Sequence, residues 1–233
     1  MARYRRTTIS GDVLEIEEFT KYEVMDRCHR RSMNIGETEE GKAEYNRRQS
    51  VRKLARLINA NFSEGDLFVT LTHREACGKD AAEKELTNFL RRLKRWRKKK
   101  KMPDLKYIAV TESSRREHHH LIINRMESDA LYDLWKLGRI MVSRLEPGGD
   151  YTGLTVYITK EEKESQKRRW RQSKNLVKPI MKIRKLKAER GRKLYPPRGY
   201  TVLESYEYYS SHGGAASYLR ALRCGGADYG GCG

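Results

Sequence analysis

Apolar residues recur along the middle of this chain at spacings that alternate between helix and strand. Near residue 50 they recur at i, i+3, i+4 and i+7, one face of an amphipathic helix, at Val51, Leu54, Ala55 and Ile58. The same spacing returns between about residues 81 and 100, before Pro103, at Leu86, Phe89, Leu90 and Leu93. The sequence therefore predicts two helices. Between them, LFVTLT at residues 67–72 follows the turn signal SEGD and predicts a strand.

The segment after Pro103 predicts a hairpin, a helix and a further strand. The predicted elements are the strands KYIAVTE (106–112), HHHLIIN (118–124) and RIMVSRL (139–145), the turn SSRR, a helix over 127–137 that stops at Gly138, and a last helix containing LTVYITKEEK. The order from residue 67 is β-α-β-β-α-β and then a helix. We therefore predict an α+β fold of the ferredoxin-like, split βαβ type, with a central antiparallel β-sheet flanked by helices.

The pattern divides the chain into three segments. Residues 1–62 are expected to form a basic N-terminal arm, with a short strand in VLEIEEF, followed by the first helix. Residues 63–180 form the β-α-β-β-α-β core, and the part after about residue 165 is expected to be a basic linker. Residues 181–233 form a basic C-terminal extension with a strand in GYTVLESYEYY, a short helix near residues 215–222 and a Gly-rich tail.

The net charge of the chain indicates the kind of partner that it binds. The chain has 50 Lys and Arg against 31 Asp and Glu, a net charge of +19, which favours a polyanion such as nucleic acid. The charge is concentrated in RRLKRWRKKKK (91–101) and in a stretch from 167 to 193. Each cluster holds one tryptophan, Trp96 or Trp170, which either packs inward or stacks on a base. The candidate DNA-binding residues are Arg91, Arg92, Lys94, Arg95, Arg97, Lys98, Arg168, Arg169 and Arg171.

Several classes of protein are not expected. The chain has no run of about 20 apolar residues to span a membrane, and no apolar stretch follows the basic start MARYRR, so a secretory signal is not expected. The four cysteines lack CxxC spacing, which fits a reducing cytoplasm better than a disulfide framework or a zinc site. No GxxxxGK[ST] loop is present, so a nucleotide-driven motor is not expected.

Three consecutive histidines, His118, His119 and His120, lie on a predicted strand. Side chains alternate along a strand, so His118 and His120 share one face, about 6.6 Å apart, and can converge on one metal ion. Glu112 is the natural third ligand, but only if the hairpin pairs it with His118 or His120, which needs an odd loop such as 113–117. A tight four-residue turn would pair it with Glu117. The alternative for the histidine run is an exposed patch, and His73 is expected in a loop.

Four motifs in order carry a resemblance. FVTLT (68–72), VTE (110–112), HHHLIIN (118–124) and YITKE (157–161) resemble those of the HUH endonucleases, most closely the rolling-circle replication initiators of bacterial phages and plasmids. The resemblance covers roughly residues 66–180. It extends more weakly to ISGDVLEIEEF near the N-terminus and to RRWRQSKNLVKP.

The resemblance implies an HUH fold and a reaction on single-stranded DNA. His118, His120 and Glu112 would hold Mg²⁺ or Mn²⁺. Tyr157 would be the nucleophile, leaving a 5′-phosphotyrosine and a free 3′-hydroxyl, with Lys160 as its partner one helical turn later. Tyr151 lies outside the helix pattern, which favours a single-tyrosine enzyme. The chain departs from the family in having His119 where a hydrophobic residue is usual, and a short loop without glycine after Glu112.

The sequence thus predicts an endonuclease that nicks and rejoins DNA at a replication origin. Relaxases and single-strand transposases use the same chemistry and remain alternatives. The alternative of another class is a non-catalytic single-stranded DNA- or RNA-binding protein, for which Phe68 and Tyr107 are the only evident stacking residues on the strands. Expected partners are single-stranded DNA or an origin hairpin, together with a host helicase and replication proteins, and no membrane. The expected location is the bacterial host cytoplasm.

Overall fold

The computed structural model describes residues 2–21, 39–113, 116–160, 170–187, 193–209 and 214–224. The chain divides into two compact units. One contains residues 61–177, and the other combines residues 1–60 with residues 178–233. The terminal segments, which the sequence predicts as a separate arm and extension, therefore belong to one unit.

The unit of residues 61–177 contains a five-stranded sheet in the order β6-β3-β5-β4-β7, with every neighbouring pair antiparallel. Its elements are β3 (Leu67–His73), α3 (Lys79–Lys99), β4 (Tyr107–Ser113), β5 (Glu117–Ile123), α4 (Ser128–Leu134), β6 (Gly138–Arg144), α5 (Thr152–Ile158) and β7 (Arg171–Gln172). The order from β3 to β6 is β-α-β-β-α-β. The predicted α+β fold of the ferredoxin-like type is confirmed.

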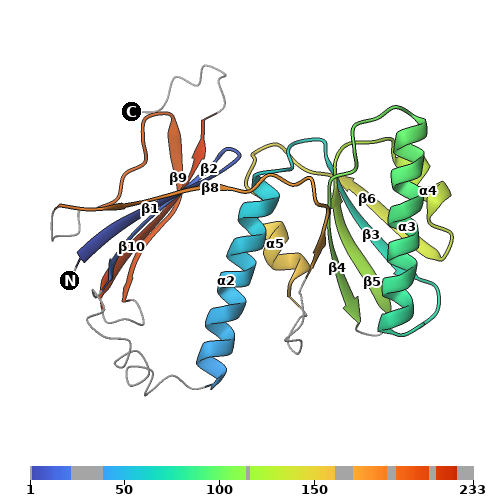
Figure 1. Cartoon of the computed structure of the whole chain (residues 1–233), viewed down its shortest axis with the longest axis horizontal. Coiled ribbons are helices and arrows are strands. Elements are labelled where there is room, and N and C mark those ends of the chain that lie inside the picture. Colours follow the sequence, from blue (N-terminus) through green and yellow to red (C-terminus); the bar gives the residue numbers. More distant parts are fainter. Residues whose placement is uncertain are drawn as a thin grey trace. The chain divides into compact units, whose positions relative to one another are not determined.

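Helices α3 and α4 cover one face of this sheet (Figure 1). The core between them contains alternate residues of β3, such as Val69 and Leu71, and the predicted apolar face of α3. Phe89 and Leu93 of that face are fully buried. Each such side chain contributes about 2–3 kcal/mol relative to exposure. This core therefore fixes which residues of β3 and β5 face the helices.

The other face of the sheet carries the remaining residues of β3 and β5. Helix α5 lies on this side, because the Tyr157 ring lies 6.3 Å from the Phe68 ring and 5.6 Å from the His120 ring. Figure 1 accordingly draws α5 and α3 on opposite sides of the strands. The face that carries α5 is called the metal face below.

The second unit is built on another antiparallel sheet, in the order β8-β1-β2-β10-β9. Its elements are β1 (Ala2–Ser10), β2 (Val13–Lys21), α2 (Glu39–Asn59), β8 (Ile180–Lys185), β9 (Tyr200–Tyr209) and β10 (Ala215–Arg223). Helix α2 is bound to the sheet through polar contacts: Arg56 pairs with the buried Glu15, whose carboxylate also accepts a 2.6 Å hydrogen bond from Tyr218.

The structure corrects several predictions in this second unit. The strands in VLEIEEF and GYTVLESYEYY are confirmed, but the N-terminal segment forms a β1–β2 hairpin rather than an extended arm. Residues 215–222 form strand β10 rather than a helix, because pairing with both β2 and β9 outweighs local helix preference. Residues 180–185 of the expected linker form the edge strand β8. The Gly-rich tail beyond Cys224 lies outside the described residues.

In the unit of residues 61–177, three features differ from the prediction. His73 is not a loop residue but the buried last residue of β3. Gly138 does not end a helix: α4 ends at Leu134, and Gly138 begins β6. The last helix, α5, ends at Ile158, and residues 161–169 of the predicted continuation lie outside the described residues.

None of the helices among the described residues is long and apolar enough to cross a membrane.

Candidate metal and tyrosine site

The register of the β4–β5 hairpin brings Glu112 to the histidines. Ser113 pairs with Glu117, and Glu112 pairs with His118. The turn therefore has the odd length that the sequence required, and no pairing of Glu112 with Glu117 occurs. Directly paired residues on antiparallel strands point to the same face. Glu112, His118 and His120 consequently share the metal face.

The side chains of these three residues meet. The Oε2 atom of Glu112 lies 2.8 Å from Nε2 of His118 and 3.5 Å from Nε2 of His120. One potential ligand atom from each residue lies within 4.8 Å of the other two. Glu112 and His120 are buried, and His118 is partly exposed. The group is therefore compact enough to surround one ion and open on the side of His118.

The Nδ1 atoms of His118 and His120 both have hydrogen-bond partners. Nδ1 of His118 lies 3.1 Å from the carbonyl oxygen of Arg116, and Nδ1 of His120 lies 3.1 Å from Oγ1 of Thr70. A carbonyl oxygen only accepts, so Nδ1 of His118 donates its hydrogen, and Nε2 is the ring nitrogen that faces Glu112. The Thr70 hydroxyl can accept from His120 in the same way. Such contacts orient metal-binding histidines.

The charge state of Glu112 suits a ligand. Burial alone would raise the pKa of this carboxyl, but hydrogen bonds and charge attraction from His120 and His118 outweigh burial and hold the pKa below its usual range. The carboxylate is therefore ionised at neutral pH. Two imidazoles and one carboxylate form a donor set that fits divalent metal ions, so Glu112, His118 and His120 could hold one.

Tyr157 is presented to the solvent beside this group. Helix α5 begins where Asp150 accepts a 3.1 Å hydrogen bond from the Thr152 amide, and Ile158 is the buried anchor of the last turn. Tyr157 is 59% exposed and its ring lies 5.6 Å from the His120 ring. In contrast, Tyr151 is 7% exposed and its hydroxyl donates to the Glu146 carbonyl. Of these two tyrosines, only Tyr157 offers an accessible hydroxyl.

Lys160 lies just beyond the helix rather than on it. Its amide donates a 3.3 Å hydrogen bond to the Tyr157 carbonyl, so the chain continues into a tight turn after Ile158. The Lys160 side chain is exposed. The predicted proximity to Tyr157 therefore arises from a turn and not from a shared helix face.

His119 occupies a position that is usually hydrophobic in the HUH endonucleases that the sequence resembles, and its surroundings account for the histidine. It faces the helices and is fully buried, with Nε2 3.1 Å from Nε2 of His73 and Nδ1 3.0 Å from Oγ1 of Thr111. The Thr111 hydroxyl in turn donates to Glu83 of α3. Burial lowers the pKa of His119 to about 3. The ring is thus a neutral, hydrogen-bonded core residue where a hydrophobic side chain would also fit.

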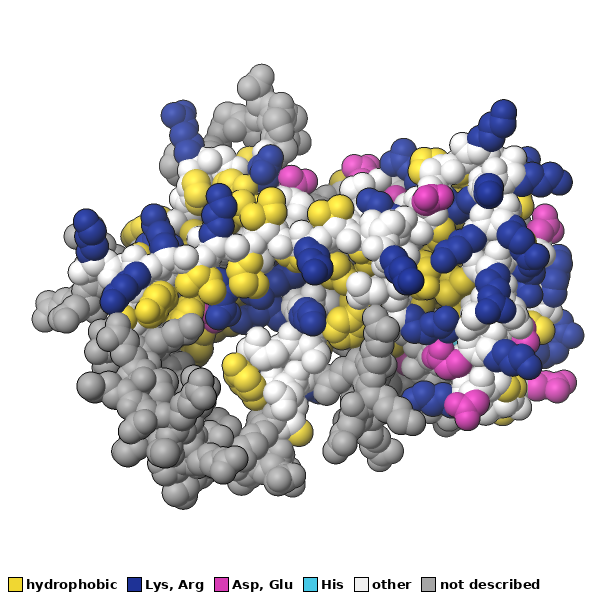
Figure 2. Space-filling view, viewed as in Figure 1, with side chains coloured by type: hydrophobic (Ala, Val, Ile, Leu, Met, Phe, Trp, Pro, Cys, Tyr) yellow, Lys and Arg dark blue, Asp and Glu magenta, His cyan; other side chains and the backbone are white. Residues whose placement is uncertain are grey.

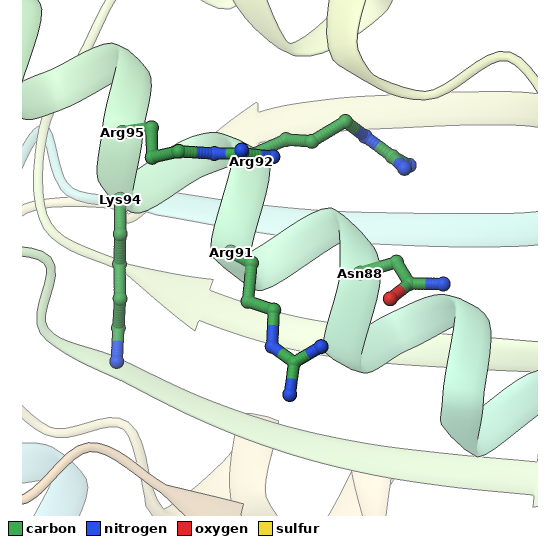
Figure 3. A pocket seen from close by; sticks show the side chains of 5 residues that line it. All are labelled: Asn88, Arg91, Arg92, Lys94 and Arg95. Carbon is green, nitrogen blue, oxygen red and sulfur yellow. The ribbon is translucent and has the colours of Figure 1, made fainter.

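The predicted DNA-binding residues separate into different environments. Figure 2 shows Lys and Arg side chains gathered over α3, and Figure 3 shows several that project from this helix. Those at least partly exposed are Arg91, Arg92, Lys94, Arg95 and Lys98. All five belong to the helix that covers the face opposite the metal face. Trp96 is partly buried and packs against the core, so the inward alternative applies to it.

Two of the remaining predicted DNA contacts, Arg97 and Arg171, bind groups within the protein. Arg97 is 2% exposed and donates to the carbonyls of Pro103, Asn124 and Arg125, so its prediction as a DNA contact is wrong: the guanidinium closes the end of α3 and does not reach solvent. Arg171 is paired with Glu83 at 3.0 Å. Arg168 and Arg169 lie outside the described residues.

Thr70 is a residue that the sequence did not reveal as part of the site. It lies within the motif FVTLT, but nothing in its type or spacing indicates a contact with a histidine 50 positions later. Only the pairing of Thr70 with His120 across β3 and β5 brings them together.

Comparison with known proteins supports a role in replication. Residues 66–162, less than half of the chain, match the model of a family described as replication-associated protein ORF2. The matched segment includes Glu112, His118, His120, Tyr157 and Lys160. No curated protein matches the chain, and no solved structure matches it. The family match, with the Glu112, His118 and His120 group inside it, supports a replication initiator.

Proposed function

We propose that this protein is a metal-dependent endonuclease that initiates rolling-circle replication by nicking single-stranded DNA through Tyr157. One observation carries the proposal. An exposed tyrosine lies on the same sheet face as a carboxylate and two histidines, with its ring 5.6 Å from the ring of His120. The match to a replication-associated family supports DNA as the substrate of this arrangement.

In the proposed reaction Tyr157 replaces one ester bond with another. Its hydroxyl oxygen attacks the scissile phosphorus and forms the tyrosyl–phosphorus bond, while the bond to the 3′-oxygen of the preceding nucleotide breaks. The phenol loses its proton, and the 3′-oxygen gains one to become a free hydroxyl. The 5′-phosphate stays on the protein, so a later 3′-hydroxyl can reverse the step and rejoin the strand. No nucleotide cofactor is needed.

The residues of the metal face have different roles in the proposed reaction. Glu112, His118 and His120 hold Mg²⁺ or Mn²⁺, which supplies positive charge that polarises the phosphoryl oxygens. A tyrosine hydroxyl has an ordinary pKa near 10 and is a weak nucleophile at neutral pH. Lys160 follows Tyr157 by three residues and has an exposed side chain, and in this proposal its ammonium group favours the phenolate or contacts the phosphate. Phe68 and His120 flank the Tyr157 ring and limit where the hydroxyl can lie.

The basic surface in the C-terminal half of α3 supplies affinity rather than chemistry, and its residues are Arg91, Arg92, Lys94, Arg95 and Lys98. Its cations contact phosphates of the same DNA outside the reacting segment, because a whole sheet separates them from the metal face. Residues 63–180 act as the catalytic core in this proposal. The initiator acts in a bacterial cytoplasm with a host helicase and replication proteins.

The test looks for the covalent intermediate. The protein is incubated with single-stranded oligonucleotides of random sequence, labelled at the 3′ end so that the label stays in the adduct, and with Mn²⁺, and adducts are separated on a denaturing gel. A labelled protein band that vanishes with EDTA and in Tyr157→Phe supports the proposal. Tyr132→Phe is the matched control, since Tyr132 is also exposed but lies on α4. Mass spectrometry then identifies the modified residue.

An adduct that persists in Tyr157→Phe would overturn the role of this residue. Tight binding without any adduct, under varied metals, would instead favour the non-catalytic binding protein. The structure weakens that alternative, because Tyr107, one of its two stacking candidates, is buried in the core on the helix side. A relaxase or a transposase would form the same adduct but differ in the DNA sequence that it selects.

A further inference from the structure

A pocket lined by arginines lies at the end of β3. Its volume is about 490 Å³, within the range of about 300–1,000 Å³ typical of small-ligand sites. The lining residues are Thr72, His73, Arg74, Arg116, Gly138, Arg139 and Met141. None of the three arginines was a candidate from the sequence, since each is isolated from the two basic clusters.

The strand register places this pocket beside the metal group. Thr72 pairs with His118 on one side and with Arg139 on the other, and His118 pairs with Glu112. Arg139, Thr72, His118 and Glu112 therefore form one row across four strands, with their side chains on the same face. The next row of the same face contains Met141, Thr70 and His120. The pocket thus opens on the metal face.

The guanidinium groups around the pocket lack acidic partners among the described residues. Within that part of the chain, no carboxylate forms an ion pair with Arg74, Arg116 or Arg139, in contrast to Arg171 and Glu83. All three side chains are exposed. Guanidinium groups bind phosphate oxygens through paired hydrogen bonds. Three arginines of this kind around one opening therefore favour a phosphate.

The backbone beneath the pocket is tightly fitted. A Cβ atom on Gly138 would lie 2.1 Å from the Thr72 carbonyl oxygen and 2.7 Å from the Arg74 amide. Only glycine allows β6 to begin this close to the end of β3, which holds Arg139 beside Arg74. Met141 is 55% exposed, and its flexible thioether offers an apolar surface for a sugar or base.

The order of groups along the metal face suggests what fills the pocket. Along β3, Phe68 lies beside Tyr157, Thr70 holds His120, and Thr72 borders the arginines. The metal group is therefore next to both: His120 contacts Tyr157, and His118 pairs with Thr72 of the pocket. We propose that the pocket of Arg74, Arg116 and Arg139 binds a backbone phosphate of the single-stranded DNA next to the scissile one, and so sets the position of the strand at Tyr157. This proposal rests on the proposed function for the identity of the strand.

Binding is measured first, in EDTA, by fluorescence anisotropy with a labelled single-stranded oligonucleotide. Arg74→Ala/Arg139→Ala should bind at least tenfold more weakly, with a salt slope lower by about 0.7 for each phosphate that the variant no longer binds. Lys79→Ala/Lys84→Ala removes the same charge from exposed positions on α3 and should bind like the wild type. Thermal unfolding of both double variants verifies that they fold.

Single neutral methylphosphonates then locate the bound phosphate. In an oligonucleotide that forms the adduct, one substitution beside the scissile position should weaken wild-type binding and slow adduct formation. The same substitution should have no further effect in Arg74→Ala/Arg139→Ala, because this variant no longer binds that phosphate. The duplex form of the oligonucleotide should show no such dependence on the two arginines.

The outcomes separate this proposal from the proposed function. If the wild type forms the adduct but Arg74→Ala/Arg139→Ala binds and reacts like the control, the phosphate pocket is refuted and the endonuclease stands. If no adduct forms, yet the arginine variant alone loses affinity for single strands, the endonuclease fails and the pocket stands only as a phosphate site for single-stranded DNA, with no scissile phosphate beside it. An effect confined to duplex DNA would also refute the pocket as stated.

Discussion

Nε2 of His118 lies 2.8 Å from Oε2 of Glu112, across the two central strands of a hairpin whose turn has an odd number of residues. The contact depends on turn length alone: one residue more or fewer would send the Glu112 side chain to the helix side of the sheet. This pairing converts a strand with two histidines into a three-residue group with mixed nitrogen and oxygen donors. It is the geometric basis of the metal-dependent proposal.

We expect Thr70→Val to weaken metal binding although Thr70 is not itself a ligand. The valine keeps the shape but removes the partner of Nδ1 of His120, and losing such a partner costs about 10–100-fold in metal affinity. Isothermal titration with Mn²⁺ measures the change. Thr72→Val is the control, one pair further along the same face, and its Mn²⁺ affinity should stay within about threefold of the wild type. Equal affinity of Thr70→Val and the wild type would contradict the orienting role.

We expect stability to fall as the pH is lowered below about 6.5, because His119 is buried in its neutral form. Its pKa is lowered from 6.5 to about 3 in the folded protein, so the unfolded chain binds more protons between these values and acid favours unfolding. At pH 5 this amounts to about 2 kcal/mol. Urea unfolding at pH 8 and pH 5 measures it.

The variant His119→Leu should lose less stability between pH 8 and pH 5 than the wild type does. Its absolute stability at pH 8 is a separate matter, since the leucine also removes the hydrogen bonds to His73 and Thr111. If the wild type and His119→Leu lose the same stability on acidification, the acid sensitivity comes from other groups.

Arg97→Ala should destabilise the protein by about 3 kcal/mol, since three backbone carbonyls lose a charged donor and a buried volume is emptied. The neighbouring Lys98→Ala should change the free energy of unfolding by less than about 0.5 kcal/mol, because its side chain is exposed. Chemical unfolding distinguishes the two. Similar losses in both variants would contradict the structural role of Arg97.

Arg91→Ala/Arg95→Ala should reduce the affinity for DNA mainly at low salt. If both side chains contact phosphates of single-stranded DNA, the slope of log K against log salt falls in magnitude by about 1.4. Binding titrations between 50 and 300 mM salt give the slope. Adduct formation at saturating DNA should be unaffected, because α3 lies on the helix side of the sheet, away from Tyr157. An unchanged salt slope would remove the α3 surface from the binding model.

The sequence predicted the core of residues 61–177 well because its elements are set by local patterns. The apolar spacing of α3 and the alternation in β3 and β5 are properties of consecutive residues, so they could be counted directly. The prediction failed at residues 215–222, where a helix-like spacing in AASYLRAL gave way to pairing with strands from both ends of the chain. It failed at Arg97 because composition does not distinguish a buried arginine from its exposed neighbours.

The sequence by itself determined that His118 and His120 share a face and that Tyr157 follows them in a known order of motifs. Only the tertiary structure decided that Glu112 joins them, that Thr70 holds His120, and that Arg74, Arg116 and Arg139 gather beside His118. The physical reason is the same in each case. Which side chains of one strand share a face follows from the two-residue repeat of that strand's backbone. Contact between strands depends instead on turn length and register, which are fixed by packing between residues far apart in the chain.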